Sequence, residues 1–312
     1  MAFRSDIDPF DFVEYVRWAE ERGAHSAWVA EWRGSDPISL LTAAARETDR
    51  IRLATGIINP YTRTPTVIAS AFATLDELSQ GRMILGLGSS HAVPHVVSWH
   101  GLKFEKPLLR TKECIEIICG ILTGRTVNYH GRIFEISNFR LPSRPIRRSV
   151  PIYLAALGPR MLRLAGEVAD GVLLNLCSPD QLSRLEEFER EGARKAGRKG
   201  SLEHSVYVPM FASEDRRAAI RAAKKALSNY LALPFYNRFL SQVGFAREAA
   251  KNTPTPKMIR ELTITGSVQD CRDSLYERIQ EFTSAGAESL ILYPRPVQGL
   301  GKAMEHFGRI LE

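Results

Sequence analysis

Nearly continuous apolar runs alternate with amphipathic segments along most of the chain. Such runs are typical of strands covered on both faces, and apolar positions spaced at 3.6 residues are typical of helices packed on one side. This alternation predicts a parallel sheet with helical crossovers. The expected strands are residues 2–5, 26–30, 51–58, 83–88, 151–157, 171–176, 205–212 and 289–294.

Two architectures fit this pattern, a closed barrel and an open doubly wound sheet. Eight strands in a chain of 312 residues favour an α/β fold of the (β/α)8 or TIM-barrel class. Residues 126–148 interrupt the rhythm with a predicted hairpin that turns at His130-Gly131, and residues 214–266 form a largely helical excursion. We interpret both as insertions into a single TIM-barrel domain, residues 1–312.

Composition narrows the classes of partner. The formal charge is +7, but the basic residues are scattered, which indicates a solvated surface and argues against nucleic acid while leaving an anionic ligand open. The four cysteines form no C-x-x-C pair and accompany no zinc-like histidine spacing, so no metal is expected. There is no signal-peptide pattern and no apolar run of about 18 residues. We therefore expect a cytoplasmic protein without a membrane partner.

Candidate chemistry follows the strands, because the site of a TIM barrel is built at the carboxyl ends of its strands. Gly158 allows a sharp turn, Pro159 begins a helix whose free N–H groups could face a phosphate, and Arg160 adds charge. The segment GLGSS, residues 86–90, is a second small-residue loop where a planar ligand could approach the backbone. Ordinary turn chemistry explains either loop equally well.

Three segments give the chain a family resemblance: WVAEWRG at 28–34, INPYTRTPTVIASAFATLDELSQGRMILGLG at 58–88, and PIYLAALGPRMLRLAGEVADGVLLN at 151–175. They resemble the luciferase-like monooxygenase superfamily. Within it they are most similar to the branch that uses the deazaflavin coenzyme F420, which includes the methylenetetrahydromethanopterin reductases. The resemblance implies an oxidoreductase that transfers a hydride between reduced deazaflavin and a small organic substrate.

The resemblance also implies site residues. Gly56-Ile57 matches a non-prolyl cis peptide that supports the cofactor's middle ring, and Gly158 to Arg160 match the holder of its phosphate. Glu31 and His91 are the catalytic candidates. The cofactor-binding candidates are Trp32, Gly56, Ile57, Ile58, Asn59, Gly86, Gly88, Ser89, Ser90, Leu157, Gly158, Pro159, Arg160 and Asn175.

Each catalytic candidate has a simpler interpretation. Glu31 could orient the cofactor or act as an acid, or it could pair with a neighbour such as Arg33. His91 could exchange a proton near the substrate, or it could be a surface histidine in a loop that also holds His95 and His100.

Three departures from the methanopterin reductases argue against methanopterin as the substrate. Phe3 stands where those enzymes carry Glu, Trp32 follows the acidic residue where many relatives have His, and His91 replaces Asp. Two alternatives to the deazaflavin enzyme stay open: an FMN-dependent monooxygenase and a non-catalytic ligand-binding barrel. The resemblance further implies a homodimer that forms through the second and third helices.

Overall fold

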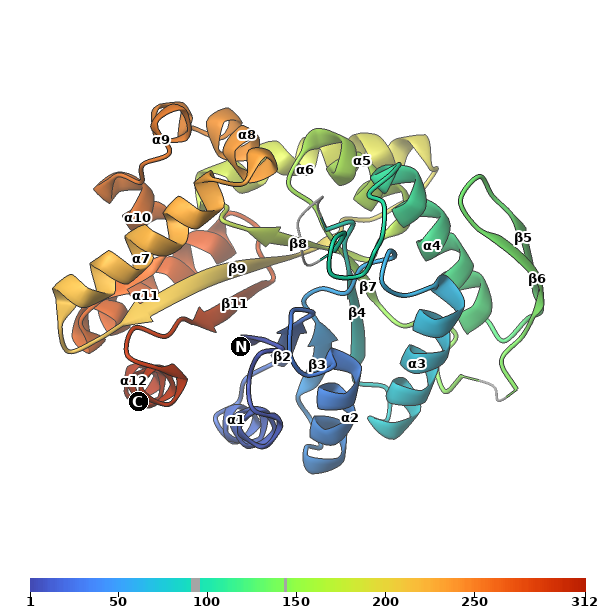
Figure 1. Ribbon diagram of the computed structural model, residues 1–312, viewed down its shortest axis with the longest axis horizontal. Coiled ribbons are helices and arrows are strands. Elements are labelled where there is room, and N and C mark those ends of the chain that lie inside the picture. Colours follow the sequence, from blue (N-terminus) through green and yellow to red (C-terminus); the bar gives the residue numbers. More distant parts are fainter. Residues whose placement is uncertain (91–95, 143–144) are drawn as a thin grey trace. The chain divides into compact units, whose positions relative to one another are not determined.

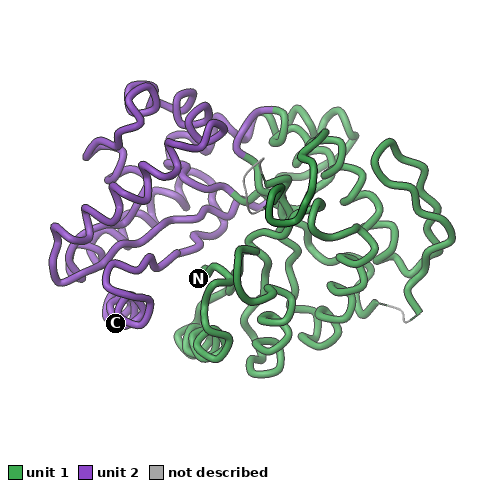
Figure 2. Tube along the Cα trace, in the orientation of Figure 1, with its two compact units in different colours: residues 1–156, 160–173, 188–202 green, residues 157–159, 174–187, 203–312 purple. Residues whose placement is uncertain are grey.

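The computed structural model describes residues 1–90, 96–142 and 145–312, and the chain forms two compact units (Figure 2). Unit 1 comprises residues 1–156, 160–173 and 188–202, and unit 2 comprises residues 157–159, 174–187 and 203–312. The expectation of a single domain with two insertions remains a prediction.

Unit 1 is built on short parallel strands (Figure 1). These strands are almost wholly buried, which explains their continuous apolar sequences. Each strand pairs in parallel with the next of this series. Strand β8 begins in unit 1, and its last two residues belong to unit 2. The series is β1 (Ala2–Arg4), β2 (Ser26–Ala30), β3 (Arg52–Thr55), β4 (Met83–Leu87), β7 (Ile152–Ala155) and β8 (Gly171–Asn175).

The helices that follow these strands share a start signal, because each begins with proline, whose missing N–H and fixed φ suit the first turn. Asp8 and Asp36 cap two of them by accepting hydrogen bonds from backbone N–H groups of the first turn. The helices are α1 (Pro9–Glu21), α2 (Pro37–Glu47), α3 (Pro65–Leu78), α4 (Pro107–Leu122), α5 (Pro159–Val168) and α6 (Pro179–Lys195).

Unit 2 is organised around one long strand, β9 (Glu203–Ala212), which pairs in parallel with β10 (Ile264–Gly266) and β11 (Ser289–Pro294). The excursion at 214–266 is helical, as expected, and it closes with β10 as an added strand beside β9. The helices of this unit are α7 (Arg216–Leu231), α8 (Pro234–Gln242), α9 (Ala246–Lys251), α10 (Pro256–Leu262), α11 (Val268–Ser284) and α12 (Leu300–Leu311).

The predicted hairpin is present as β5 (Val127–His130) and β6 (Glu135–Phe139), which pair antiparallel. Its turn is centred on residues 132–133, two residues later than predicted, since Gly131 N–H donates to the Phe134 carbonyl at 2.9 Å. The buried carboxylate of Glu113 on α4 sets this position by accepting N–H bonds of 2.8 to 3.0 Å from residues 132–134. A partner so distant in the sequence leaves no local signal.

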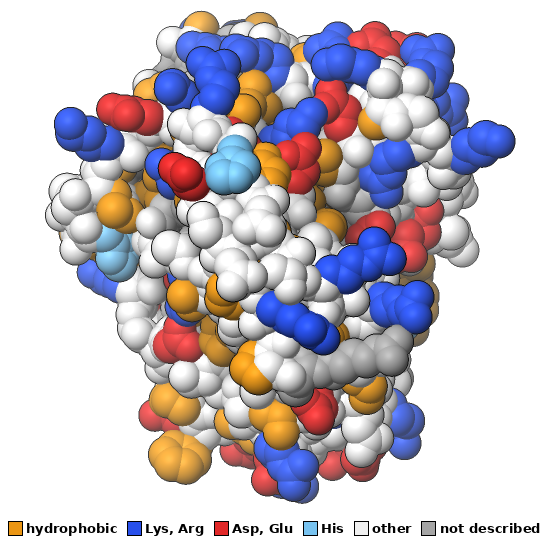
Figure 3. All heavy atoms as spheres, turned by 90° about the vertical axis from the view of Figure 1, so that its right-hand side faces the viewer, with side chains coloured by type: hydrophobic (Ala, Val, Ile, Leu, Met, Phe, Trp, Pro, Cys, Tyr) orange, Lys and Arg blue, Asp and Glu red, His pale blue; other side chains and the backbone are white. Residues whose placement is uncertain are grey.

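Charged side chains are dispersed on the face shown in Figure 3, where Lys and Arg lie among acidic, apolar and neutral groups. This agrees with the scattered basic residues of the sequence. Among the described residues, no helix combines the length and apolarity that crossing a bilayer requires.

Candidate functional site

The segment that follows β3 is held between two strands at their carboxyl ends. The Gly56-Ile57 peptide bond is cis, as the family resemblance implied. On one side, Gly56 N–H donates to Val29 at 2.8 Å and Glu31 N–H donates to Ile57 at 3.0 Å. On the other side, Ile58 forms a parallel bridge to Leu87 of β4. The segment 56–59 is therefore fixed by β2 and β4 together, although β3 itself ends at Thr55, earlier than predicted.

Contacts within the protein require glycine at position 86 and leave little room for a side chain at position 88. A Cβ on Gly86 would overlap the carbonyl oxygen of Thr55. The Thr55 hydroxyl Oγ1 also accepts from the N–H of Gly86 at 3.0 Å and donates to its carbonyl at 2.8 Å. A Cβ on Gly88 would lie 3.0 Å from Cβ of Ala155 and 3.2 Å from Cδ1 of Ile57. Both glycines let β4 pack directly under the 55–58 segment.

Glu31 is the centre of a polar network beside that segment. Its Oε2 accepts from Asn59 Nδ2 at 3.0 Å and from Thr62 Oγ1 at 3.1 Å, and its Oε1 accepts from Arg63 Nε at 2.9 Å. The ion pair is thus with Arg63 and not with the neighbour Arg33. Asn59 Oδ1 in turn accepts the N–H groups of Tyr61 and Thr62, at 3.0 and 3.1 Å. These contacts use Glu31 as an acceptor that fixes Asn59, which is a positioning role.

Arg63 joins Glu31 to Asp36, the cap of α2, so one guanidinium serves two carboxylates. Burial opposes the charge of Arg63, but the two carboxylates outweigh it and raise the pKa of the guanidinium. Burial likewise works to raise the pKa of Asp36, but bonds from the Ser39 N–H and from Arg63 lower it overall. Arg63 and Asp36 are therefore charged at neutral pH, and their ion pair ties the start of α2 to the site.

Asp36→Asn is expected to reduce the loss of stability in acid. Because the pKa of Asp36 is lowered in the folded state, the carboxylate stabilises the fold above its unfolded pKa of about 3.9, and this contribution is lost as pH falls through the folded pKa. Urea unfolding at neutral pH and near pH 3 measures the difference. Asp11→Asn, at an exposed position of α1, is the control. If Asp36→Asn and the wild type lose the same free energy of unfolding between neutral pH and about pH 3, the cluster does not stabilise the fold.

Aromatic side chains lie beside the Glu31 network. Trp32 meets Trp99 edge to face, with ring centroids 6.2 Å apart, and the guanidinium of Arg4 lies 5.1 Å from the Trp32 ring. The backbone N–H of Trp32 donates to Ser5 Oγ at 3.0 Å, and this bond fixes the backbone after β2. These contacts are consistent with Trp32 as part of a pocket wall.

The remaining candidates of unit 1 follow β4 and β7. Ser89 Oγ donates to the carbonyl of Ser90 at 3.2 Å, and Ser90 has a left-handed φ of 53°. His91 lies outside the described residues, so its catalytic role remains a prediction. Arg160 is exposed on the first turn of α5.

The other candidates belong to unit 2. Nothing lies within 4 Å of a Cβ built on Gly158, so the backbone at the start of α5 is open. Asn175, at the end of β8, donates through Nδ2 to the hydroxyl of Tyr236 on α8 at 2.6 Å. Tyr236 is itself packed edge to face on Tyr230, with centroids 4.7 Å apart. The sequence did not single out either tyrosine, because both lie in the helical excursion that matched the family by pattern only.

Comparison with known proteins decides the family. The model of the luciferase-like monooxygenase family matches residues 4–289. The chain belongs to this family. It is 32% identical over 309 residues to the 5,10-methylenetetrahydromethanopterin reductase of Archaeoglobus fulgidus, covering 93% of this chain and 91% of the relative. It is also 32% identical over 236 residues to the F420-dependent glucose-6-phosphate dehydrogenase of Amycolatopsis mediterranei, covering 70% of each.

The fold class is confirmed by a solved member of the luciferase-like family. The coenzyme F420-dependent tetrahydromethanopterin reductase of Methanopyrus kandleri matches with a TM-score of 0.79 at 28% identity, over 99% of this chain and 96% of that one. The predicted luciferase-like TIM barrel is therefore correct. Phe3, a departure from the reductases, is buried in β1 and packs on Phe12 with centroids 5.5 Å apart, so it belongs to the core.

Sequence reasoning missed part of the Glu31 network. Arg63 lies in the segment INPYTRTP, which carries the family resemblance, but the resemblance implies no role for it. The available signal was its place four residues after Asn59, just before the proline that begins α3. Thr62 and Asp36 carry no signal of their own, since their importance depends on contacts with Glu31 and Arg63.

Proposed function

We propose that this protein is an oxidoreductase that uses coenzyme F420 and transfers a hydride between the reduced deazaflavin and a small organic substrate. The observation that carries the proposal is the fixed segment 56–59, which lies at the carboxyl ends of β2, β3 and β4 and is braced by Glu31. In TIM barrels this end of the strands holds the site. Two relatives of the family that are 32% identical to this chain are named for F420 or for methanopterin reduction.

The residues present suit a flat ring with an anionic tail. Ile57 is partly exposed and offers apolar surface, while Ile58 and Asn59 are buried behind it, with Asn59 held in place by Glu31. Gly158 leaves its surroundings open at the start of α5, where free N–H groups and the helix dipole favour a phosphate. The residues proposed to hold the cofactor are Trp32, Gly56, Ile57, Ile58, Asn59, Gly86, Gly88, Ser89, Ser90, Leu157, Gly158, Pro159, Arg160 and Asn175.

The deazaflavin, when bound, supplies or accepts the hydride. The chain's own contribution is placement. The hydrogen bonds of 56–59 to β2 and β4 prevent this segment from shifting, and Glu31 fixes the amide of Asn59. Trp32, packed against Trp99, excludes water from one side. Because Glu31 already accepts bonds from three side chains, we assign it to positioning and leave proton transfer to His91 as a prediction.

Two alternatives keep the fold. An FMN-dependent monooxygenase would use the same strand ends, and a non-catalytic barrel would bind ligand without turnover. The relatives named for F420 favour the deazaflavin over FMN. The homodimer through α2 and α3 remains a prediction, and exposed Val67 and Leu78 on α3 are compatible with it.

Fluorescence titration of the purified protein with F420 and with FMN tests the proposal. We expect saturable binding of F420 and binding of FMN that is at least about tenfold weaker. The Asn59→Leu variant should weaken binding of F420, because the 56–59 segment loses the bonds that Asn59 makes with Glu31 and with the N–H groups of residues 61 and 62. Tight binding of FMN with none of F420 would reverse the assignment, and binding without turnover of any electron acceptor would favour the non-catalytic barrel.

A further inference from the structure

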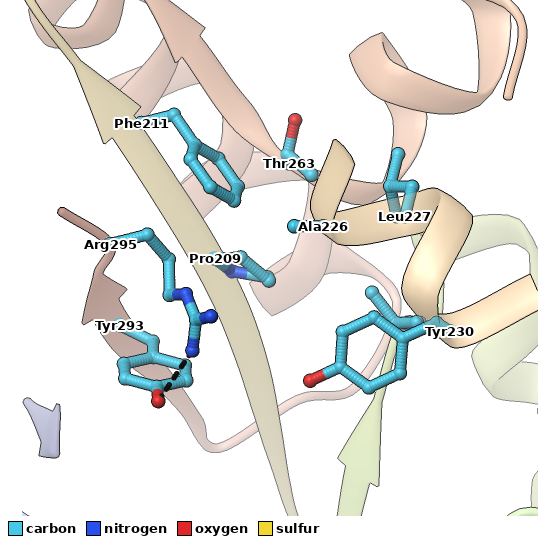
Figure 4. Close-up of a pocket in the computed structure, with 9 residues that line it drawn as sticks. Pro209, Phe211, Ala226, Leu227, Tyr230, Thr263, Tyr293 and Arg295 are labelled. Carbon is cyan, nitrogen blue, oxygen red and sulfur yellow. Dashed lines mark hydrogen bonds between the residues drawn. The ribbon is translucent and has the colours of Figure 1, made fainter. Parts of the chain in front are cut away.

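A small hollow in unit 2 opens beside the end of β11 (Figure 4). Pro209 and Phe211 of β9 form one wall, Tyr230 of α7 another, and Tyr293 and Arg295 a third. Of the nine described residues that line it, Arg295 is the one with a charged side chain. The hollow therefore presents a guanidinium against mostly apolar and aromatic surface.

Arg295 is held in place without a carboxylate. Its backbone N–H donates to Met210 at 2.8 Å, and its guanidinium stacks 4.7 Å from the Tyr293 ring and donates to that hydroxyl at 2.6 Å. No described residue forms an ion pair with it. The guanidinium has five N–H donors in a fixed fork, so most remain available to a ligand.

Other stacked or buried arginines differ in their partners: some pair with carboxylates, Arg82 donates to backbone carbonyls, and Arg110 stacks on Tyr61 without an ion pair among the described residues. Arg63 pairs with Glu31 and Asp36, and Arg163, which stacks 4.8 Å from the ring of Phe188, pairs with Glu191. Among the described residues the guanidinium of Arg295 has neither a carboxylate nor a backbone carbonyl as acceptor, so its remaining N–H donors suit an anion. The position of Arg295, one residue after the carboxyl end of a barrel strand, is where ligands bind in this fold class.

We infer that Arg295 anchors a carboxylate or phosphate group of the substrate, with the hydroxyl of Tyr230 beside it as a second donor. This inference rests on the proposed function and adds a substrate class to it: a small organic molecule that carries an anionic group. The hollow has room for about one water molecule, so the anion binds at its mouth, where the guanidinium is accessible.

The anion at Arg295 could belong to the substrate or to the carboxylate-bearing tail of the deazaflavin. A binding measurement distinguishes these two sources. Inorganic phosphate serves as the probe, titrated calorimetrically into the protein alone and into the protein saturated with F420. Saturation blocks the proposed phosphate site at Gly158. The variants are Arg295→Gln, Arg295→Lys and, as the matched control, Arg163→Gln, which removes a stacked arginine that already has a carboxylate partner.

We expect Arg295→Gln to weaken phosphate binding about tenfold or more with F420 present, Arg295→Lys to retain part of it, and Arg163→Gln to match the wild type. The affinity for F420 should be equal in all four proteins. Thermal unfolding confirms that each variant is folded. Unchanged phosphate affinity in Arg295→Gln overturns the inference. The inference also fails if Arg295→Gln binds F420 more weakly than the wild type but binds a tail-less deazaflavin equally well, since Arg295 then holds the cofactor's tail. If F420 fails to bind at all while phosphate still depends on Arg295, the proposed function fails and the anion site stands.

Discussion

Gly86→Ala is expected to lower the free energy of unfolding by about 4 kcal/mol or more, or to prevent folding altogether. The added methyl would overlap the carbonyl oxygen of Thr55, and that oxygen belongs to the backbone, which cannot rotate away as a flexible side chain can. Separating β3 from β4 would also break the bonds of Thr55 Oγ1 to Gly86. Urea unfolding measures the loss, or the yield of soluble protein reports it if the variant does not fold.

Gly158→Ala is the matched control, because its methyl enters open space. Its free energy of unfolding should stay within about 0.5 kcal/mol of the wild type, while binding of the anionic cofactor weakens. Equal stability of Gly86→Ala and the wild type would mean that β4 does not pack against Thr55 as described.

Glu31→Gln is expected to reduce kcat/KM for hydride transfer by about 100-fold and to destabilise the fold by about 2 kcal/mol. The amide cannot accept from Arg63 and Asn59 as the carboxylate does, so Arg63 loses a charge partner and Asn59 loses the contact that orients it. Steady-state kinetics and urea unfolding measure the two effects separately.

The double variant Glu31→Gln with Arg63→Met separates stability from positioning. In Glu31→Gln the guanidinium of Arg63 keeps its ion pair with Asp36, so removing it as well should lower the stability further. The rate should not fall again, because Asn59 is already unbraced. A rate for Glu31→Gln within twofold of the wild type would contradict the positioning role.

Much of the architecture could be predicted from the sequence, because local patterns encode it. The apolar run MILGL gives β4, and prolines mark the starts of α1 to α6. The strand after Arg52 was predicted too long, since apolar residues continue to Ile58 while the chain leaves the ladder after Thr55. Apolar character reports burial, but it does not report the break at residues 56–57, after which Ile58 pairs with Leu87 as an isolated bridge.

The candidate site was predicted less completely, for a physical reason. Glu31, Asn59 and Gly86 sit at strand ends, a position that the barrel pattern identifies. Asp36, Tyr236 and Arg295 matter through contacts with residues distant in sequence, and a single chain does not display those contacts. The partner of Glu31 shows the limit, since a sequence neighbour, Arg33, was the obvious choice and Arg63 holds it in the structure.

A crystal structure of the protein with bound F420 is the most direct test of the central claim. We predict that the deazaflavin ring lies against Ile57, with Ile58 buried behind it and Glu31 still bonded to Asn59. A ring bound elsewhere, with the 56–59 segment covered by the protein's own side chains, would contradict the account.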